Sequence, residues 1–581
     1  MTRQFAPLAP LQDWGAELLG TVGEDLPLWS VALWAPGATG VTVETRDGET
    51  ALSRHDDGVH RGTIEAPVGA AYRFSVDGQT CPDPAARAQE GDVHGWSLLR
   101  VPARVPHWPG RPWHEAVILE IHVGLFTEDG TLDAAALRLP ALAEAGITAV
   151  ELMPLAQFAG DRGWGYDGVL PYAVHPAYGG PDALARFVTA AHEAGLMVLL
   201  DVVYNHFGPD GAYLHAIAPE FFDEGRHTPW GAAIDFTRPQ VRRFFIENAL
   251  MWIEDFGLDG LRLDAVHQLH DPSDPPFVEE LCARIRARDL NRPVHIVTED
   301  ERNLPDLRQA GLATAEWNDD YHHAVHCLLT GERAGYYASF AHDPMADLVT
   351  ALARGHVEEG QPRPGRDSPR GAPSGHLPPT AFVNSNQTHD QIGNRAQGER
   401  LIALAGPEAM RVAHALLLCA PAIPMLFMGE EIGARAPFLF FADLKGDLAR
   451  AVREGRAAEF ADFESFAGAV PDPLAPETFT ASRPYASPPP DAEAWTALTA
   501  EALRFRHNAV MPLLASGRAA PAEVTRTGAR AMHGIWPFEA GTLEIRANLG
   551  APPDTPWTLP GADVVIGSGA DPFAFAATVA Q

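Results

Sequence analysis

The spacing of hydrophobic and polar positions divides the chain near residue 115. Before that point, short apolar runs alternate with polar residues and end at Gly, Pro or Asp turns: SVALWAP (30–36), VTVETRDG (41–48) and YRFSVDG (72–78). A period of two predicts strands with one buried face. We therefore expect an N-terminal β-sandwich over residues 1–105. The Pro-rich stretch at 101–113 is typical of a linker.

After residue 115, continuous apolar runs that end in polar residues alternate with helical segments. The runs are VILEIHV (117–123), AVELMPL (149–155), MVLLDVVYNH (197–206), GLRLDAVH (260–267), VHIVTED (294–300), FVNSNQTHD (382–390) and PMLFMGEE (424–431), and LATAEWNDD (312–320) supplies the eighth. Such runs are typical of a parallel sheet covered by helices on both faces. The pattern predicts an α/β fold, a (β/α)8 TIM barrel over residues 106–515. Its active site would lie at the carboxyl ends of the strands.

Two segments outside the regular barrel pattern lead to separate expectations. Residues 355–380 are rich in Pro, Gly and Arg, which predicts a long, mobile loop before the seventh strand. From residue 516 the chain returns to short strand-like runs, such as MHGIWPF and TLEIRANL, which predict a small C-terminal β domain over 516–581.

Composition narrows the classes of function. The 581 residues carry a formal net charge of −33, which disfavours binding to nucleic acid or to anionic lipid surfaces. No apolar run is long enough to span a bilayer and the N-terminus lacks a signal-peptide core, so we expect a cytoplasmic protein. The four cysteines lie far apart, which predicts neither a disulfide framework nor a zinc site. We expect no metal and no cofactor.

Carboxylates at two adjacent strand ends suggest glycosidic chemistry. In GLRLDAVH, Arg262 and Asp264 face the same side of a strand, and the guanidinium would keep the carboxylate ionised. A structural Arg–Asp pair explains the motif equally well. Glu299 ends the next strand behind an apolar run, an environment that suits a general acid, although a solvated loop position is an alternative. Together, Asp264 and Glu299 fit the pair of a retaining glycosidase, whose carboxyl groups lie about 5 Å apart.

Further polar residues collect at other strand ends. DVVYNH provides Asp201 and His206, and NQTHD provides His389 and Asp390, which could hydrogen-bond sugar hydroxyls or ligate a metal. The histidines lack an HxH or HExxH spacing, which favours the sugar interpretation. The HHAVH run (322–326) is expected to be structural and to lie on the surface. Three aromatic residues are candidate platforms for a pyranose ring, with core packing as the alternative: Trp164, Tyr166 and Trp230.

These segments resemble, in order, the four signature segments of the α-amylase superfamily: DVVYNH, GLRLDAVH, the Glu of VTED and the THD of NQTHD. The resemblance implies that Asp264 is the nucleophile, Glu299 the general acid and base, and Asp390 a third carboxylate that orients the sugar. It also implies substrate-binding roles for other residues. These are His206, His389, Arg262, which supports Asp264, and Tyr166, with Asp201, Trp230 and His267 as further candidates.

Within that superfamily, longer stretches are similar to the malto-oligosyltrehalose trehalohydrolase family, among them DVVYNHFGPDGAYL, TPWGAAIDF and HDQIGNRAQGER. The resemblance implies cleavage of the α-1,4 bond next to the trehalose unit of maltooligosyl trehalose, an α-glucan substrate, and functional coupling to a maltooligosyl trehalose synthase. One departure is Thr388, where an Asn is usual in the last signature. The alternatives are a branching or debranching enzyme of the same superfamily, and a non-catalytic α-glucan-binding protein.

Overall fold

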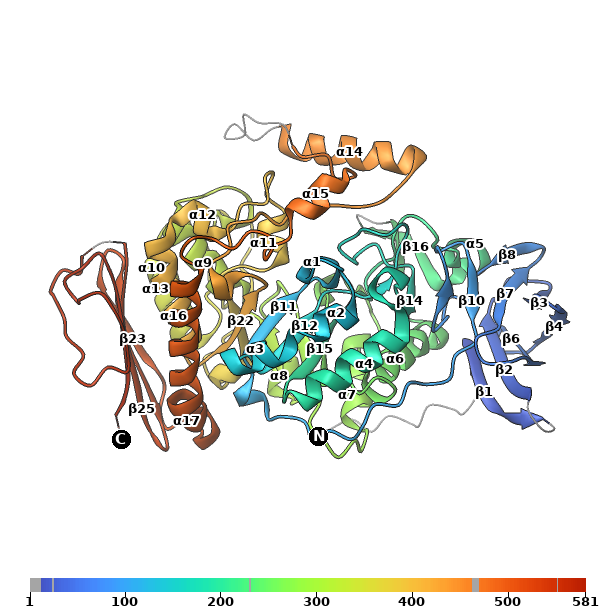
Figure 1. Cartoon of the computed structure of the whole chain (residues 1–581), viewed down its shortest axis with the longest axis horizontal. Helices are drawn as coiled ribbons and strands as arrows, with labels where there is room; N and C mark the ends of the chain where they lie inside the picture. The colour runs from blue at the N-terminus through green and yellow to red at the C-terminus, as the bar shows by residue number, and fades with distance from the viewer. Residues whose placement is uncertain (1–11, 23–25, 229–230, 462–469, 551, 581) are drawn as a thin grey trace.

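A computed structural model describes residues 12–22, 26–228, 231–461, 470–550 and 552–580. The regions follow one another along the long axis of the molecule (Figure 1). An N-terminal pair of β-sheets lies at one end, a β/α barrel occupies the middle, and a C-terminal sheet lies at the other end.

The N-terminal region consists of two antiparallel sheets, with the order β1-β2-β6-β5 in one and β4-β3-β7-β10-β9 in the other. In β7, Tyr72, Phe74 and Val76 are buried and alternate with more exposed residues, as the period of two predicts. The strands are β1 (Gly15–Val22), β2 (Leu26–Trp34), β3 (Val41–Thr45), β4 (Gly48–Ala51), β5 (Ser53–Arg54), β6 (Val59–Glu65), β7 (Ala71–Val76), β8 (Gln79–Cys81), β9 (Gln89–Glu90) and β10 (Trp96–Leu98).

Eight parallel strands close into a barrel in chain order, because the last strand, β22, pairs with the first, β11. The barrel and the flanking sheets confirm the predicted fold class. The barrel strands are β11 (Ile118–Ile121), β12 (Ala149–Leu152), β15 (Met197–Val202), β18 (Gly260–Leu263), β19 (His295–Thr298), β20 (Ala315–Trp317), β21 (Phe382–Ser385) and β22 (Ile423–Phe427). Two short hairpins accompany them, β13 (Ala156–Gln157) with β14 (Leu170–Val174), and β16 (Phe222–Thr228) with β17 (Gly231–Ile234).

Helices connect and surround the strands. In α4, Leu184, Phe187, Val188 and Ala191 are buried on one face at helical spacing. Helix α3 ends at Gly146, whose φ of +100° requires glycine. The helices are α1 (Val123–Phe126), α2 (Leu132–Ala136), α3 (Leu139–Ala145), α4 (Gly180–Glu193), α5 (Leu214–Ile217), α6 (Pro239–Glu254), α7 (Phe277–Arg286), α8 (Asp306–Gln309), α9 (Asp319–Thr330), α10 (Pro344–Arg354), α11 (His389–Gly393), α12 (Leu401–Ala405), α13 (Pro407–Cys419), α14 (Gly446–Ala461), α15 (Pro476–Ala481), α16 (Ala492–Phe505) and α17 (Met511–Ser516).

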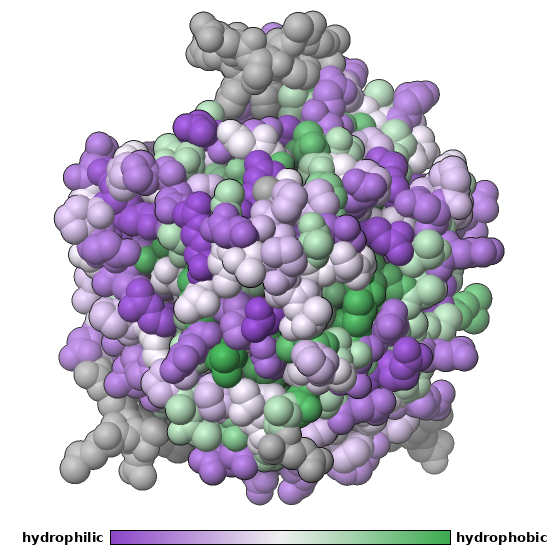
Figure 2. All heavy atoms as spheres, turned by 90° about the vertical axis from the view of Figure 1, so that its left-hand side faces the viewer, coloured by the Kyte–Doolittle hydropathy of each residue, from purple (hydrophilic) through white to green (hydrophobic). Residues whose placement is uncertain are grey.

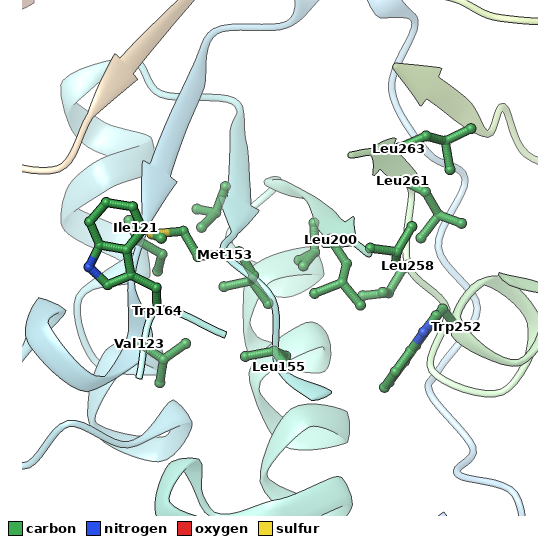
Figure 3. Close-up of a cluster of buried hydrophobic side chains, with 14 of the residues drawn as sticks. Ile121, Val123, Met153, Leu155, Trp164, Leu200, Trp252, Leu258, Leu261 and Leu263 are labelled. Atoms are coloured by element: carbon green, nitrogen blue, oxygen red, sulfur yellow. The ribbon is translucent and has the colours of Figure 1, made fainter. Parts of the chain in front are cut away.

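The barrel strands bury apolar side chains on both faces. A smaller cluster that includes Ile118, Leu199 and Met425 fills the bore. The larger cluster lies between the strands and the surrounding helices, where Figure 3 shows Leu261, Leu263 and neighbouring side chains. Each fully buried leucine contributes about 1.5–3 kcal/mol. These two layers hold the strand ends, and therefore the residues that follow them, in fixed positions.

The loop at 355–380 is not the free segment that its composition suggests. Glu358 is fully buried and accepts hydrogen bonds from Arg366 at 3.0 Å and Arg370 at 2.5 Å. Its backbone N–H and that of Val357 donate to Asp320 of α9. The prediction of a mobile loop is therefore wrong, because ion pairs and backbone hydrogen bonds tie the loop to the barrel.

The Pro-rich segment at 101–113 also packs against the barrel. The indole of Trp108 lies flat on His192 and donates to Asp259 at 2.8 Å, and Trp113 donates to the carbonyl of Thr380. These contacts fix the segment that follows the N-terminal sheets against the barrel.

The C-terminal sheet has the order β23-β24-β25-β27-β26 and contacts the barrel through Trp536, whose indole donates to the Leu352 carbonyl of α10. Its strands are β23 (Glu523–Gly528), β24 (Ala531–Phe538), β25 (Gly541–Leu549), β26 (Val564–Ile566) and β27 (Phe573–Ala580). Figure 2 shows this end of the molecule, where hydrophilic residues predominate and apolar ones are interspersed. Among the described residues, no helix has the length and apolar character needed to cross a membrane.

Candidate active site

The strand alternation that buries leucines outside the barrel directs charged residues inward. Leu261 and Leu263 lie in the outer apolar cluster (Figure 3), so Arg262 between them faces the bore. Arg262 pairs in register with Asp201 of β15. The charged residues lie nearer the carboxyl ends of their strands than the apolar bore cluster does. A polar layer therefore closes the bore at the carboxyl end of the barrel.

Arg262 is the centre of this layer. Its side chain is 0% exposed, and its guanidinium lies 2.7 Å from Asp201, 2.6 Å from Asp264 and 2.7 Å from Glu299. The guanidinium also stacks over the Trp317 ring, 4.1 Å from its centroid. One buried cation thus brings together three carboxyl groups that come from three separate strands.

Asp264 is held as a carboxylate. Burial works against the charge, but Arg262, a 2.7 Å hydrogen bond from the Asn205 amide, and His206 outweigh it and lower the pKa of Asp264 below its usual value. An ionised carboxylate with fixed orientation is what attack on an anomeric carbon requires.

The pKa of Glu299 is shifted in the opposite direction from that of Asp264. Burial raises the pKa of Glu299 well above its usual value, and the nearby charges of Asp264 and Asp390 raise it further, against the effect of Arg262. The backbone N–H of Ala265 donates to a Glu299 carboxyl oxygen at 2.8 Å and fixes the side chain. Two carboxyl groups on neighbouring strands whose pKa values are pushed apart fit a nucleophile and a general acid.

Ala265, which directly follows Asp264, adopts a left-handed backbone conformation with φ +41° and ψ +52°. This conformation is unfavourable for a residue with a Cβ. Hydrogen bonds to Glu299 from the N–H groups of Ala265 and Val266 maintain it. The strained turn thus links the two candidate catalytic carboxyls directly.

Asp390 and His389 begin α11, just beyond β21. Thr388 caps this helix, and its hydroxyl accepts from the Asp390 N–H at 3.3 Å. The Asp390 side chain is 37% exposed, so a substrate can reach it. His389 is buried, and its Nε2 lies 3.4 Å from Asp390. His389 also contacts Glu120 of β11 through its Nδ1.

Tyr166 lies beside these groups. Its hydroxyl donates to Asp201 at 2.5 Å, and its ring stacks on the His389 imidazole with a centroid distance of 5.1 Å. Burial raises the pKa of Asp201 to about 6, while Arg262 opposes the shift. His206 is buried with its Nε2 2.9 Å from the Tyr166 carbonyl oxygen, and burial lowers its pKa.

The remaining sequence candidates have different locations. His267 lies three residues beyond Asp264, and its Nε2 is 3.8 Å from a Glu301 carboxylate oxygen. Trp164 is a core residue that stacks on Phe438 and donates to a backbone carbonyl, so it offers no free face. Trp230 lies outside the described residues.

The HHAVH run is buried within α9, so its predicted surface location is wrong. His322 contacts the Asn386 carbonyl oxygen and the Tyr337 hydroxyl, and His326 pairs with Glu332 at 2.7 Å. The interactions agree with a structural role. Within the part of the chain that the structure describes, no group of three His, Cys, Asp or Glu side chains is placed to hold a metal ion.

Residues that the sequence did not single out complete the site: Glu120, Asn205 and Trp317. Asn205 lies inside the DVVYNH motif next to His206, so its position in the sequence could have indicated a place in the site. Glu120 interrupts the apolar run VILEIHV, and a lone carboxylate on a fully buried strand is itself a sign of a functional or paired group. Trp317 gave no such signal, because a tryptophan in an apolar run is ordinary core.

Several known proteins are similar to this chain in sequence or in structure. A family model for the alpha amylase catalytic domain matches residues 87–223. The malto-oligosyltrehalose trehalohydrolase of Deinococcus radiodurans is 42% identical over 459 residues, which covers 78% of this chain and 76% of that protein. That of Arthrobacter ramosus is 42% identical over 472 residues, with 78% and 82% covered. A crystal structure from Salmonella typhimurium, assigned as an alpha amylase, is 43% identical with a TM-score of 0.92 and covers 98% of this chain and 100% of that one.

Proposed function

The chain belongs to the malto-oligosyltrehalose trehalohydrolase family, and on that premise we propose that it hydrolyses the α-1,4-glucosidic bond next to the trehalose unit of maltooligosyl trehalose and releases trehalose. One observation carries the chemistry. A single buried guanidinium contacts both an ionised carboxylate, Asp264, and a carboxyl group with a raised pKa, Glu299. This combination supports the assignment of Asp264 as the nucleophile and Glu299 as the general acid of a retaining glycosidase.

The proposed reaction is a double displacement. Asp264 attacks the anomeric carbon while Glu299 gives its proton to the glycosidic oxygen, so the C–O bond breaks and trehalose leaves. Glu299, now a carboxylate, removes a proton from water, and the hydroxyl oxygen attacks the same carbon. The bond to Asp264 breaks, and the maltooligosaccharide leaves with retained configuration. Asp390, whose side chain is 37% exposed, would hold sugar hydroxyls during both steps.

Recognition of the 1,1-linked disaccharide is assigned to segments around the carboxyl end of the barrel. The β16–β17 hairpin and the α14–α15 segment lie above the carboxyl end of the barrel (Figure 1). Trp230 remains a sequence-based candidate for the leaving-group side. A Trp230→Ala variant should lose its preference for maltooligosyl trehalose over a maltooligosaccharide of equal length, and unchanged preference would contradict this role.

The sequence also suggests the cellular setting. A cytoplasmic location and functional coupling to a synthase that makes maltooligosyl trehalose belong to this proposal, since the substrate must be supplied by an enzyme that forms a terminal 1,1-linkage. Copurification of the two enzymes, or direct transfer of the intermediate without its release, would test the coupling.

A product assay tests the proposed function. Maltooligosyl trehalose and a maltooligosaccharide of equal length are incubated separately with the wild type and with Asp264→Ala. We expect rapid trehalose release from the first substrate, little hydrolysis of the second, and no activity in the variant. New α-1,6 branches without trehalose release would instead identify a branching enzyme. Inertness on every α-glucan would favour a binding protein.

A further inference from the structure

Glu120 makes a two-point contact with His389 that the signature segments do not explain. One carboxylate oxygen of Glu120 contacts Nδ1 of the imidazole, and the other accepts the backbone N–H of His389 at 3.2 Å. Both side chains are about 1–2% exposed. Glu120 lies in the middle of β11, a strand that is buried at every position, so the carboxylate cannot swing away to solvent.

The surroundings fix the orientation of the His389 ring. Tyr166 stacks on one face of it, while Trp164 meets it edge-on at a centroid distance of 5.8 Å. With Nδ1 directed at Glu120, Nε2 is the ring nitrogen on the side of Asp390, at 3.4 Å. The charged and titratable groups that act on His389 are Glu120 and His122 from β11 and its end, Glu151 from β12, Asp201 from β15, Arg262 from β18 and Asp390 from α11.

We propose that Glu120 is a positioning residue that holds His389 as an imidazolium, with Nε2–H on the side of Asp390, where the sugar would bind. The proposal deepens the proposed function and rests on it for the identity of the sugar. A doubly protonated ring donates from Nδ1 to Glu120 and from Nε2 to a substrate hydroxyl, and charge-assisted hydrogen bonds are about twice as strong as neutral ones. A neutral ring would have to leave one of these two positions without a proton.

The electrostatics of the site support this assignment. Burial alone would lower the pKa of His389, but Asp390 and Glu120 outweigh it and raise the pKa to about 9. The imidazolium should therefore persist at neutral pH and be lost only as the pH rises through that value.

Glu151 provides a matched control. It lies on the neighbouring strand in register with Glu120 and is equally buried, but neither of its carboxyl oxygens has a hydrogen-bond partner among the described residues. Burial raises the pKa of Glu151 well above its usual value, and the nearby Glu120 and Asp201 raise it further, so the neutral form of its carboxyl group is favoured. A Glu151→Gln substitution therefore changes a buried carboxyl group at the same level of the barrel but breaks no hydrogen bond to His389.

The experiment compares the wild type, Glu120→Gln and Glu151→Gln. The protein is labelled with ¹⁵N and ¹³C at histidine, and the His389 ring signals are assigned from their loss in a His389→Asn variant. The signals are followed from pH 5 to 10, and kcat/KM for maltooligosyl trehalose is measured over the same range. We expect an imidazolium at pH 7 in the wild type and in Glu151→Gln. In Glu120→Gln the His389 pKa should fall by at least about one unit, a tenfold change in the protonation equilibrium.

The pH dependence of kcat/KM should follow the protonation of His389. In Glu120→Gln, kcat/KM should begin to fall at lower pH than in the wild type, whereas Glu151→Gln should keep the wild-type profile. An unchanged His389 pKa in Glu120→Gln, or an equal shift in both variants, would overturn the proposal. A neutral His389 in the wild type at pH 7 would also overturn it, even if Glu120→Gln did not fold.

The two proposals fail in different ways. If the wild type releases no trehalose but His389 titrates as described, the assigned substrate is wrong and the positioning role stands. If trehalose is released but His389 is neutral, the positioning role is wrong and the assigned function stands.

Discussion

Replacement of Arg262 by methionine tests the electrostatic basis of the site. The substitution keeps a long apolar side chain that can still cover Trp317, but it removes the cation shared by Asp264 and Glu299. Two unit charges about 4 Å apart interact by about 4 kcal/mol at an effective dielectric constant of about 20. At 1.36 kcal/mol per pKa unit, the loss should raise the pKa of Asp264 by about three units. The pKa of Glu299 should also rise.

The direction in which each limb of the pH profile moves follows from the proposed roles of Asp264 and Glu299. Asp264 must be ionised, so activity is present above its pKa and is lost as the pH falls through it. Glu299 must be protonated, so activity is lost as the pH rises through its pKa. In the wild type the acid limb of the kcat/KM profile should lie below about pH 4, because the pKa of Asp264 is held below its usual value. In Arg262→Met both limbs should move to higher pH, the acid limb by about three units.

The assay measures trehalose release from maltooligosyl trehalose between pH 4 and 9. Arg262→Lys, which keeps a positive charge but not the planar fork, is the matched control and should shift the limbs less. Circular dichroism and thermal unfolding confirm that each variant is folded, because an unpaired buried carboxylate also costs about 3–5 kcal/mol of stability. A folded Arg262→Met enzyme with an unmoved acid limb would refute the reasoning.

Three further predictions follow from individual contacts. Glu299→Gln should lower kcat for maltooligosyl trehalose by about 10²–10⁴-fold but spare an aryl glycoside with a good leaving group, and an equal loss in kcat for both substrates would exclude the acid role. Ala265→Val places a β-branched residue at φ +41° and should destabilise the fold by about 1–3 kcal/mol, measured by denaturant unfolding with Ala265→Gly as the control. Arg370→Ala removes an ion pair from Glu358, whose side chain is 1% exposed, and should expose residues 355–380 to limited proteolysis. Resistance equal to the wild type would contradict the tied-down loop.

The barrel could be predicted because its strands are buried on both faces and therefore appear as continuous apolar runs. Even the three-residue strand β20 falls within the run at 312–320. The loop at 355–380 could not be predicted in the same way. Its composition is that of an exposed segment, and what orders it is a set of contacts to Asp320 and to a buried glutamate, Glu358, within the loop itself. Pairings of arginine with carboxylates distant in sequence leave no local pattern.

Some residues of the candidate site could likewise be predicted from the sequence, and others could not. Asp264 and Glu299 were predicted because each directly follows a strand, and strand ends of a parallel barrel meet at one place. Arg262 was predicted because it lies two residues before Asp264, on the same face of the strand. Glu120 also faces the bore, but it lies inside its strand, where sequence patterns indicate core. Trp317 contributes through its ring face over the guanidinium, a contact that depends on the geometry of two neighbouring strands.

Thr388 illustrates how the position of a side chain decides the meaning of a substitution. In the sequence, Thr388 places a hydroxyl where the last signature segment usually has an amide. In the structure the Thr388 side chain is buried and caps α11, with its hydroxyl bonded to the N–H of Asp390 and to the side chain of Gln391. Threonine and asparagine are both good helix caps, so either residue can orient His389 and Asp390. The Thr388 hydroxyl therefore acts on the sugar only through the orientation of His389 and Asp390, and we expect Thr388→Asn to leave the substrate preference unchanged.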